Sequence, residues 1–166
     1  QRLRQPGGLS LDLSGIAKGY AVDAIADLLS DRGIDHALIE VGGELVGRGI
    51  QPSGEPWWVD LETPPGAVLT PIRAALHGCA VATSGSYVRG NHSIDPRTGR
   101  PATNRVLSVS VLARTAMLAD ALATAIAVGY PDTTFDGIEV AARIVLQEGD
   151  AIIEVLTPPM MRWLDN

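Results

Sequence analysis

The sequence has little of several residue types on which specialised protein classes depend. A single cysteine, Cys79, excludes an intrachain disulfide, and its small apolar neighbours predict a buried, inert thiol. No run of eighteen apolar residues occurs, so we predict no membrane-spanning helix. Aromatic residues make up only 4% of the chain and the formal net charge is −6. A general nucleic-acid-binding protein has a basic face, and this composition predicts none.

Lysine is the scarcest charged residue. Lys18 is the only lysine, since the other twelve basic residues are arginines. It lies in LDLSGIAKGYAVD, in the first turn of a predicted helix, where an ammonium group opposes the helix dipole and therefore indicates an anionic partner. Asp12 is one candidate partner, and a phosphate bound at the helix N-terminus is the other. The motif GxxxxGK[ST] is absent, which excludes a P-loop.

What the chain does contain is typical of a folded domain with many turns. Of 166 residues 46% are hydrophobic, with eighteen glycines and eleven prolines. Hydrophobic periodicity predicts strands at 9–13, 36–41, 57–62, 72–77, 79–83, 106–112 and 151–156, and helices at 16–31, 115–128 and 134–146. Ser14 and Thr115 are the expected helix caps. This alternation predicts an α/β (or α+β) fold with a mixed sheet.

The first predicted helix has apolar residues at helical spacing. We expect these residues to form the face that packs on the core: Ile16, Tyr20, Ile25, Leu28 and Leu29.

Asp120 is the only charged residue in the apolar stretch MLADALATAIAV. Thr124 follows one helical turn later, on the same face of the predicted helix. A carboxylate in such a helix needs a partner, because burying it alone costs several kcal/mol. Carboxylate and hydroxyl oxygens suit Mg²⁺. Alternatively, Arg114 pairs with Asp120 and Thr124 bonds back to its own helix.

The stretch HSIDPRTGRP places His92 directly before a stiff turn. Pro96 fixes its own φ and Gly99 tolerates positive φ, so PRTG predicts a tight turn. A histidine held there can exchange a proton near neutral pH, although it can also be an ordinary solvated loop residue. No GxSxG elbow accompanies it, which excludes an α/β-hydrolase.

Five segments together resemble one known family. In chain order they are DLSGIAKGYAVD, EVGGE, VATSGSY, HSIDPRTGRP and ADALATA, within roughly residues 9–157. This combination is similar to the ApbE-type FAD:protein FMN transferases. The resemblance implies a T-fold-like α/β architecture and a Mg²⁺-dependent reaction, in which FMN passes from FAD to a threonine of an acceptor protein and AMP leaves.

Residue roles are implied by the same resemblance. Asp120 and Thr124 would hold Mg²⁺ together with the backbone carbonyl of Gly15. A metal ion and one lysine can neutralise the charge of phosphoryl transfer even on an acidic chain, since that reaction depends on positioning and electrostatics.

The remaining implied roles concern FAD and the acceptor. Asp12 and Lys18 would contact FAD, with Lys18 near the pyrophosphate, and Ile94 would line the flavin site. His92 would be the general base that takes the proton of the acceptor hydroxyl. We expect residues 1–166 to be a single flavin transferase domain without the region that the family has before its DLSG-like motif, since only eleven residues precede Asp12.

Two departures and two alternatives accompany this resemblance. The missing region bears on FAD affinity, and Glu44 stands after the double glycine where aspartate is common. One alternative is a Mg²⁺-dependent FAD pyrophosphatase that makes FMN and AMP, and the other is a non-catalytic flavin-binding remnant. The family suggests a place outside the cytoplasmic membrane, often lipid-anchored, with cytoplasmic members also known; the chain itself leaves its location open.

Overall fold

The protein is described by a computed structural model that covers residues 4, 6–8, 11–87, 90, 93–132 and 138–164. Its helices are α1 (Ala17–Ser30), α2 (Ala116–Gly129) and α3 (Pro158–Leu164). Its strands are β1 (Ala37–Val41), β2 (Glu44–Arg48), β3 (Trp57–Asp60), β4 (Arg73–Leu76), β5 (Cys79–Gly85), β6 (Ile94–Asp95), β7 (Arg100–Pro101), β8 (Val106–Ala113), β9 (Ala141–Glu148) and β10 (Ala151–Leu156). The predicted α/β class is confirmed.

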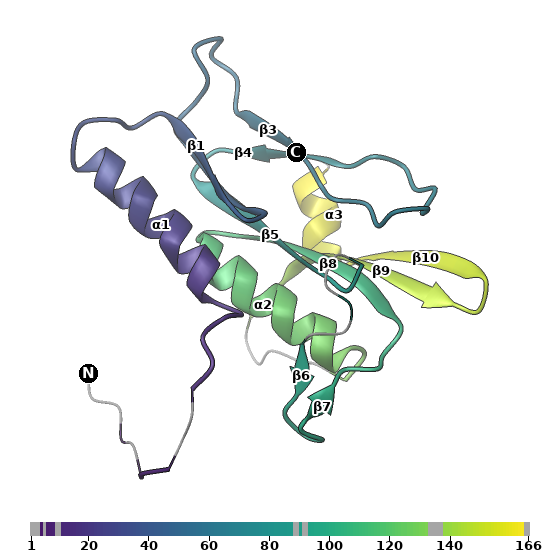
Figure 1. Cartoon of the computed structure of the whole chain (residues 1–166). Coiled ribbons are helices and arrows are strands. Elements are labelled where there is room, and N and C mark those ends of the chain that lie inside the picture. Colours follow the sequence, from purple (N-terminus) through teal and green to yellow (C-terminus); the bar gives the residue numbers. More distant parts are fainter. Residues whose placement is uncertain are drawn as a thin grey trace.

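Six strands form the central sheet, in the order β1-β2-β5-β8-β9-β10. Every pairing in it is antiparallel, whereas we expected a mixed sheet. Short turns join β1 to β2 and β9 to β10, and such hairpins require antiparallel partners. Figure 1 shows α1 and α2 lying side by side across one face of this sheet.

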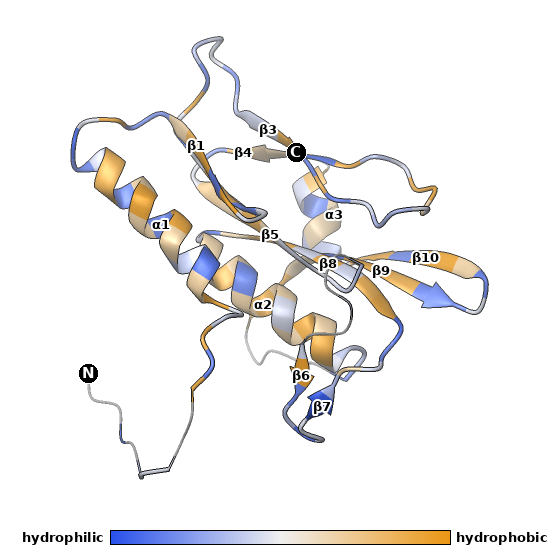
Figure 2. Ribbon diagram, viewed as in Figure 1, coloured by the Kyte–Doolittle hydropathy of each residue, from blue (hydrophilic) through white to orange (hydrophobic). Residues whose placement is uncertain are grey.

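Both faces of the sheet are covered, because successive residues of a strand point to opposite sides. On β5, Ala82 packs in a core cluster with α2, whereas Val81 belongs to a second cluster that contains Met160 of α3. The β3–β4 hairpin contributes Leu76 to that second cluster. Figure 2 shows α2 coloured mainly hydrophobic, with strongly hydrophilic positions at β7. The sheet is therefore the middle of three layers.

Several predicted elements are confirmed and others are wrong. The helices at 16–31 and 115–128 and the strands at 36–41, 57–62, 72–77, 79–83, 106–112 and 151–156 correspond to observed elements. Residues 11–13 of the first predicted strand form no strand, and residues 9 and 10 lie outside the described part. Strand β2 and helix α3 were not predicted.

The predicted helix at 134–146 is wrong. Residues 133–137 lie outside the described part, and Ala141 opens strand β9, whose first six residues are all buried. Because β9 lies between β8 and β10 in a sheet covered on both sides, it shows no alternation of apolar and polar residues. Alanine, leucine and arginine are also good helix formers, so the sequence of β9 was mistaken for that of a helix.

The predicted inner face of α1 is wrong at Tyr20, Ile25 and Leu28, whereas Leu29 packs against a core cluster as predicted. Tyr20 is 63% exposed and Leu28 is 50% exposed, whereas Gly19, Val22 and Ala26 are buried. A Cβ on Gly19 would lie 2.3 Å from the backbone oxygen of Ala116, so α1 and α2 meet with almost no side chain between them. This close approach determines which face of α1 turns inward.

One of the two predicted helix caps is confirmed and the other is wrong. Thr115 caps α2 as predicted, since its side chain accepts a hydrogen bond from the Leu118 N–H. Ser14 does not cap α1, which begins at Ala17, because its hydroxyl and N–H both donate to Asp12. None of the helices that the structure describes is long and apolar enough to cross a membrane.

Candidate functional site

Asp120 lies on the buried side of α2, 3% exposed, and faces α1. Its Oδ2 accepts a hydrogen bond from the backbone N–H of Gly19 at 3.0 Å. The alternative in which Arg114 pairs with Asp120 is therefore wrong. The carboxylate is held by the first turn of α1, where free N–H groups and the positive end of the helix dipole stabilise a negative charge.

Thr124 lies one turn further along α2, beside the loop that leads into α1. Its Oγ1 is 3.1 Å from Oγ of Ser84 on β5, so it does not bond back to its own helix. A Cβ on Gly15 would lie 3.3 Å from this Oγ1, which shows how closely the backbone of residue 15 approaches. Gly15, Asp120 and Thr124 all line one cavity of about 810 Å³.

Lys18 lines the same cavity. Its Nζ donates to Oε1 of Glu44 at 2.6 Å and to the carbonyl of Gly42 at 3.4 Å. Asp12 is not its partner, since that carboxylate accepts the hydroxyl and N–H of Ser14 at 2.6 and 2.9 Å. These bonds, the hydroxyl one first, lower the pKa of Asp12. Burial raises the pKa of Glu44, although the Lys18 ammonium opposes that rise.

Ile94 opens the short hairpin of β6 and β7 and is 53% exposed. The tight turn predicted at 96–99 is confirmed, with Gly99 at φ +66° and its N–H donating to the carbonyl of Asp95 at 2.8 Å. His92 lies outside the described residues. Its neighbour Ser93 lines the cavity of about 810 Å³, as does Ile94.

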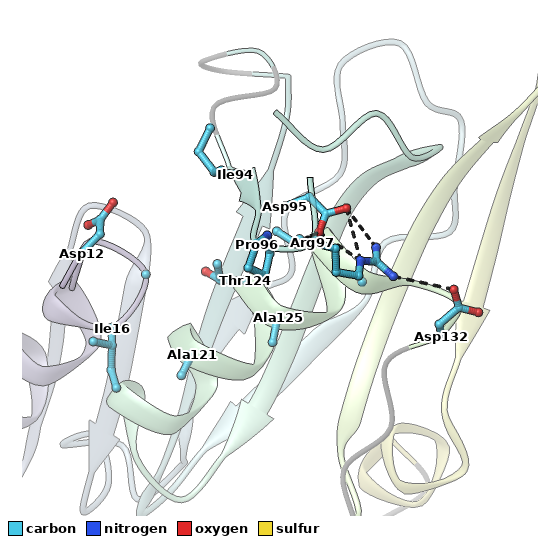
Figure 3. A pocket seen from close by; sticks show the side chains of 13 residues that line it. Asp12, Ile16, Ile94, Asp95, Pro96, Arg97, Ala121, Thr124, Ala125 and Asp132 are labelled. Atoms are coloured by element: carbon cyan, nitrogen blue, oxygen red, sulfur yellow. Dashed lines mark hydrogen bonds and ion pairs between the residues drawn. The ribbon is translucent and has the colours of Figure 1, made fainter. Parts of the chain in front are cut away.

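A second pocket, of about 510 Å³, shares Asp12, Gly15, Ile94 and Thr124 with the first. Figure 3 shows Asp12, Thr124 and Ile94 around it, with ion pairs that join Asp95 to Arg97 and Arg97 to Asp132 along one side. The two pockets thus share some of the residues that the resemblance assigns to the metal and to FAD, whereas Lys18 and Asp120 line only the larger pocket.

Sequence reasoning missed the contacts of Glu44 and of Glu62. Glu44 is 1% exposed and pairs with Lys18. Glu62 accepts a hydrogen bond from the Tyr87 hydroxyl, and both of these residues line the larger cavity. Burial, followed by the Glu62 carboxylate, raises the pKa of Tyr87 well above its ordinary range. A single lysine in an acidic chain was a signal that some buried acid would pair with it.

The chemistry of these donors fits Mg²⁺ better than a transition metal. Among the described residues no group of three or more histidines, cysteines and carboxylates could hold a metal. Asp120 and Thr124 instead offer oxygen atoms at the wall of an open cavity, and Thr124 lies next to Gly15. Mg²⁺ typically takes one or two protein carboxylates and completes its shell with water and phosphate oxygens.

Comparison with known proteins identifies one family to which this chain is similar. The model of the ApbE family matches residues 1–145. A protein of Klebsiella pneumoniae named FAD:protein FMN transferase is 35% identical over 170 residues, which cover 94% of this chain and 48% of that protein. A Vibrio cholerae protein of the same name is 43% identical over 129 residues, which cover 72% of this chain and 39% of its own length.

Solved structures give the same result. The apo form of the Pseudomonas stutzeri flavinyl transferase ApbE superposes with a TM-score of 0.81 at 33% identity, covering 93% of this chain and 50% of that one. The flavin transferase ApbE from Vibrio cholerae superposes with a TM-score of 0.75 at 33% identity, covering 93% of this chain and 52% of that one. The chain therefore spans about half the length of these relatives, or less. With its family match over residues 1–145, this chain belongs to the ApbE family.

Proposed function

We propose that this chain carries the catalytic site of an FAD:protein FMN transferase, with Mg²⁺ as its metal and a threonine of another protein as acceptor. One observation supports this most: Asp12, Gly15, Lys18, Ile94, Asp120 and Thr124 all line a single cavity of about 810 Å³. Pockets for small molecules and cofactors typically have volumes of about 300–1,000 Å³. The proposed reaction is taken from the name that the relatives share, and the cavity supports it as a candidate binding site.

Different residues of the chain would bind the metal, the linked phosphates and the flavin. Asp120, Thr124 and the carbonyl of Gly15 would hold Mg²⁺, which when bound neutralises phosphate charge and orients the pyrophosphate. Lys18 places an ammonium on the same cavity wall, where it can bind the oxygens of the linked phosphates. Ile94 offers an apolar, half-exposed surface for the flavin ring. Bound Mg²⁺ and Lys18 would together offset the negative charge of the pyrophosphate on an acidic protein.

The proposed transfer exchanges one P–O bond for another. The acceptor threonine oxygen forms a bond to the phosphorus of the FMN half, while the bond from that phosphorus to the bridging oxygen breaks and AMP leaves. His92 takes the hydroxyl proton. A general base contributes typically about 10²–10⁴-fold, and His92 directly precedes Ser93, which lines the cavity.

A labelling assay tests the proposal. The protein is incubated with FAD, Mg²⁺ and a threonine-containing acceptor protein, and covalent flavin is measured by mass spectrometry beside released AMP. We expect one FMN on the acceptor per AMP released, and no labelling with EDTA. Asp120→Asn should abolish labelling, and His92→Ala should slow it by about 10²-fold or more. Release of free FMN at the same rate without acceptor would favour the pyrophosphatase, and FAD binding without labelling or AMP release would favour the non-catalytic flavin-binding remnant.

A further inference from the structure

Glu44 has no role in the proposed transfer, yet it lies fully inside the protein beside the cavity. It opens β2 and is 1% exposed. Its Oε1 accepts a hydrogen bond from Lys18 Nζ at 2.6 Å, whereas its Oε2 is buried and has no hydrogen-bond partner among the described residues. A buried carboxylate is costly unless it is paired. The pair with Lys18 is therefore the main contact that stabilises this charge.

The double-glycine turn before Glu44 holds the lysine from a second side. Gly42 and Gly43 have φ of +63° and +99°, where other residues are strained. A Cβ on Gly42 would lie 3.4 Å from Cδ of Lys18, which places the lysine stem in contact with this turn. The carbonyl of Gly42 also accepts from Nζ at 3.4 Å.

Lys18 needs such contacts if it is to stay at the cavity wall. Its side chain is 41% exposed, and a lysine with access to solvent has many rotamers. Its position in the first turn of α1 adds repulsion from the helix dipole. Without a fixed negative partner, the ammonium group would move toward solvent. Of its three N–H donors, Glu44 and Gly42 take two, which leaves one for a ligand oxygen.

We propose that Glu44 is a positioning residue that holds the Lys18 ammonium at the cavity wall, where it meets the linked phosphates of a dinucleotide. The identity of that ligand rests on the proposed function, but the ion pair does not. Glu44 thus acts on substrate binding through Lys18, and the hydrogen bond described for its side chain goes to Lys18 and not to Asp120 or Thr124.

The single lysine of the chain gives a test that needs no substrate. Protein labelled with ¹⁵N-lysine has one side-chain ammonium resonance, and contact with a buried carboxylate should protect it from exchange with water. We expect the resonance to be visible in the wild type and in Glu44→Asp, and to be broadened by fast exchange in Glu44→Gln. A resonance that is unchanged in Glu44→Gln would overturn the positioning role.

Steady-state kinetics with FAD test the consequence. We expect Glu44→Gln to raise KM for FAD by about tenfold while kcat changes by less than about threefold, because ground-state binding is lost. Glu44→Asp should restore most of the affinity. In a double-mutant cycle, Glu44→Gln should add nothing to Lys18→Met, and additive effects would refute action through the lysine.

Two controls separate the ways in which this can fail. Urea denaturation of each variant shows whether it folds. If Lys18→Met does not fold, the comparison of Glu44→Gln with Glu44→Asp still tests the positioning role of Glu44. If the wild-type protein neither binds nor turns over FAD, the proposed function fails while the ammonium resonance still reports on the ion pair. If the wild type is active and Glu44→Gln matches it in KM, this inference alone fails.

Discussion

Replacing Gly19 with alanine tests the contact between α1 and α2 on which the site is built. A Cβ at this position would lie 2.3 Å from the oxygen and 2.5 Å from the carbon of the Ala116 carbonyl, and 2.7 Å from Cα of Met117. All three atoms belong to the backbone of α2, so no side-chain rotation relieves the clash. The two helices must separate by about 1 Å before the contact becomes an ordinary one.

The cost of this change can be worked out from opposing contributions. Overpacking costs typically about 1–3 kcal/mol, and contact with backbone places this case at the upper end. Alanine is a better helix former than glycine by about 1 kcal/mol. We therefore expect the free energy of unfolding to fall by about 2 kcal/mol, which in a domain of this size lowers Tm by about 4–8 °C.

Urea denaturation followed by circular dichroism measures the effect. Ala24→Gly is the matched control, because Ala24 is exposed on the same helix and its replacement changes helix propensity alone, by about 1 kcal/mol. Separation of the helices also stretches the 3.0 Å hydrogen bond from Gly19 to Asp120. A Gly19→Ala protein as stable as the wild type, or more stable, would show that the helices do not approach so closely.

Four further predictions follow from individual contacts. Asp23 accepts the N–H groups of Ala116 and Met117 at 2.9 Å each, so Asp23→Ala should lower the free energy of unfolding by about 1–2 kcal/mol in urea titrations. Arg143 is fully buried and bonds to Glu154 and to the backbone of Leu61 and Glu62, so Arg143→Met should cost about 3–5 kcal/mol in the same assay. Thr124→Ser should retain Mg²⁺-dependent labelling and Thr124→Val should lose it, because only serine keeps the hydroxyl beside Ser84. Since burial and Glu62 raise the pKa of Tyr87, one of the three tyrosines should stay protonated well above pH 10 in an absorbance titration, and Tyr87→Phe should remove that late step.

Local patterns were sufficient to predict most elements and to single out some residues of the candidate site. Thr115 as a cap, the turn closed by Gly99 and the strand at 106–112 depend on neighbours within a few positions of each other. Lys18 and Asp120 stood out because each is unusual in its own segment, whereas Gly15 and Ile94 were implied only by the resemblance to the family. A residue type that is rare in its segment can be recognised from the sequence alone, without knowledge of the tertiary structure.

The partners of those residues could not be read in the same way. Lys18 pairs with Glu44, 26 positions away, and Gly19 donates to Asp120, 101 positions away. Local reasoning instead offered Asp12 and Arg114, charges close by in the sequence. The packing of α1 against α2 and β2 decides which acid pairs with which donor. That packing depends on Gly19, because a side chain at this position would meet the backbone of α2.

The same contact links stability to the candidate chemistry. Just before α1, Gly15 lies against Thr124. The first turn of α1 then brings Lys18 to Glu44 and Gly19 to Asp120, whose carboxylate accepts the Gly19 N–H. One helical turn thus positions the proposed metal ligands and the only lysine at once. A change that moves this turn displaces all of them together, so substitutions at the α1–α2 contact should impair FAD turnover through geometry even where every reacting group is intact.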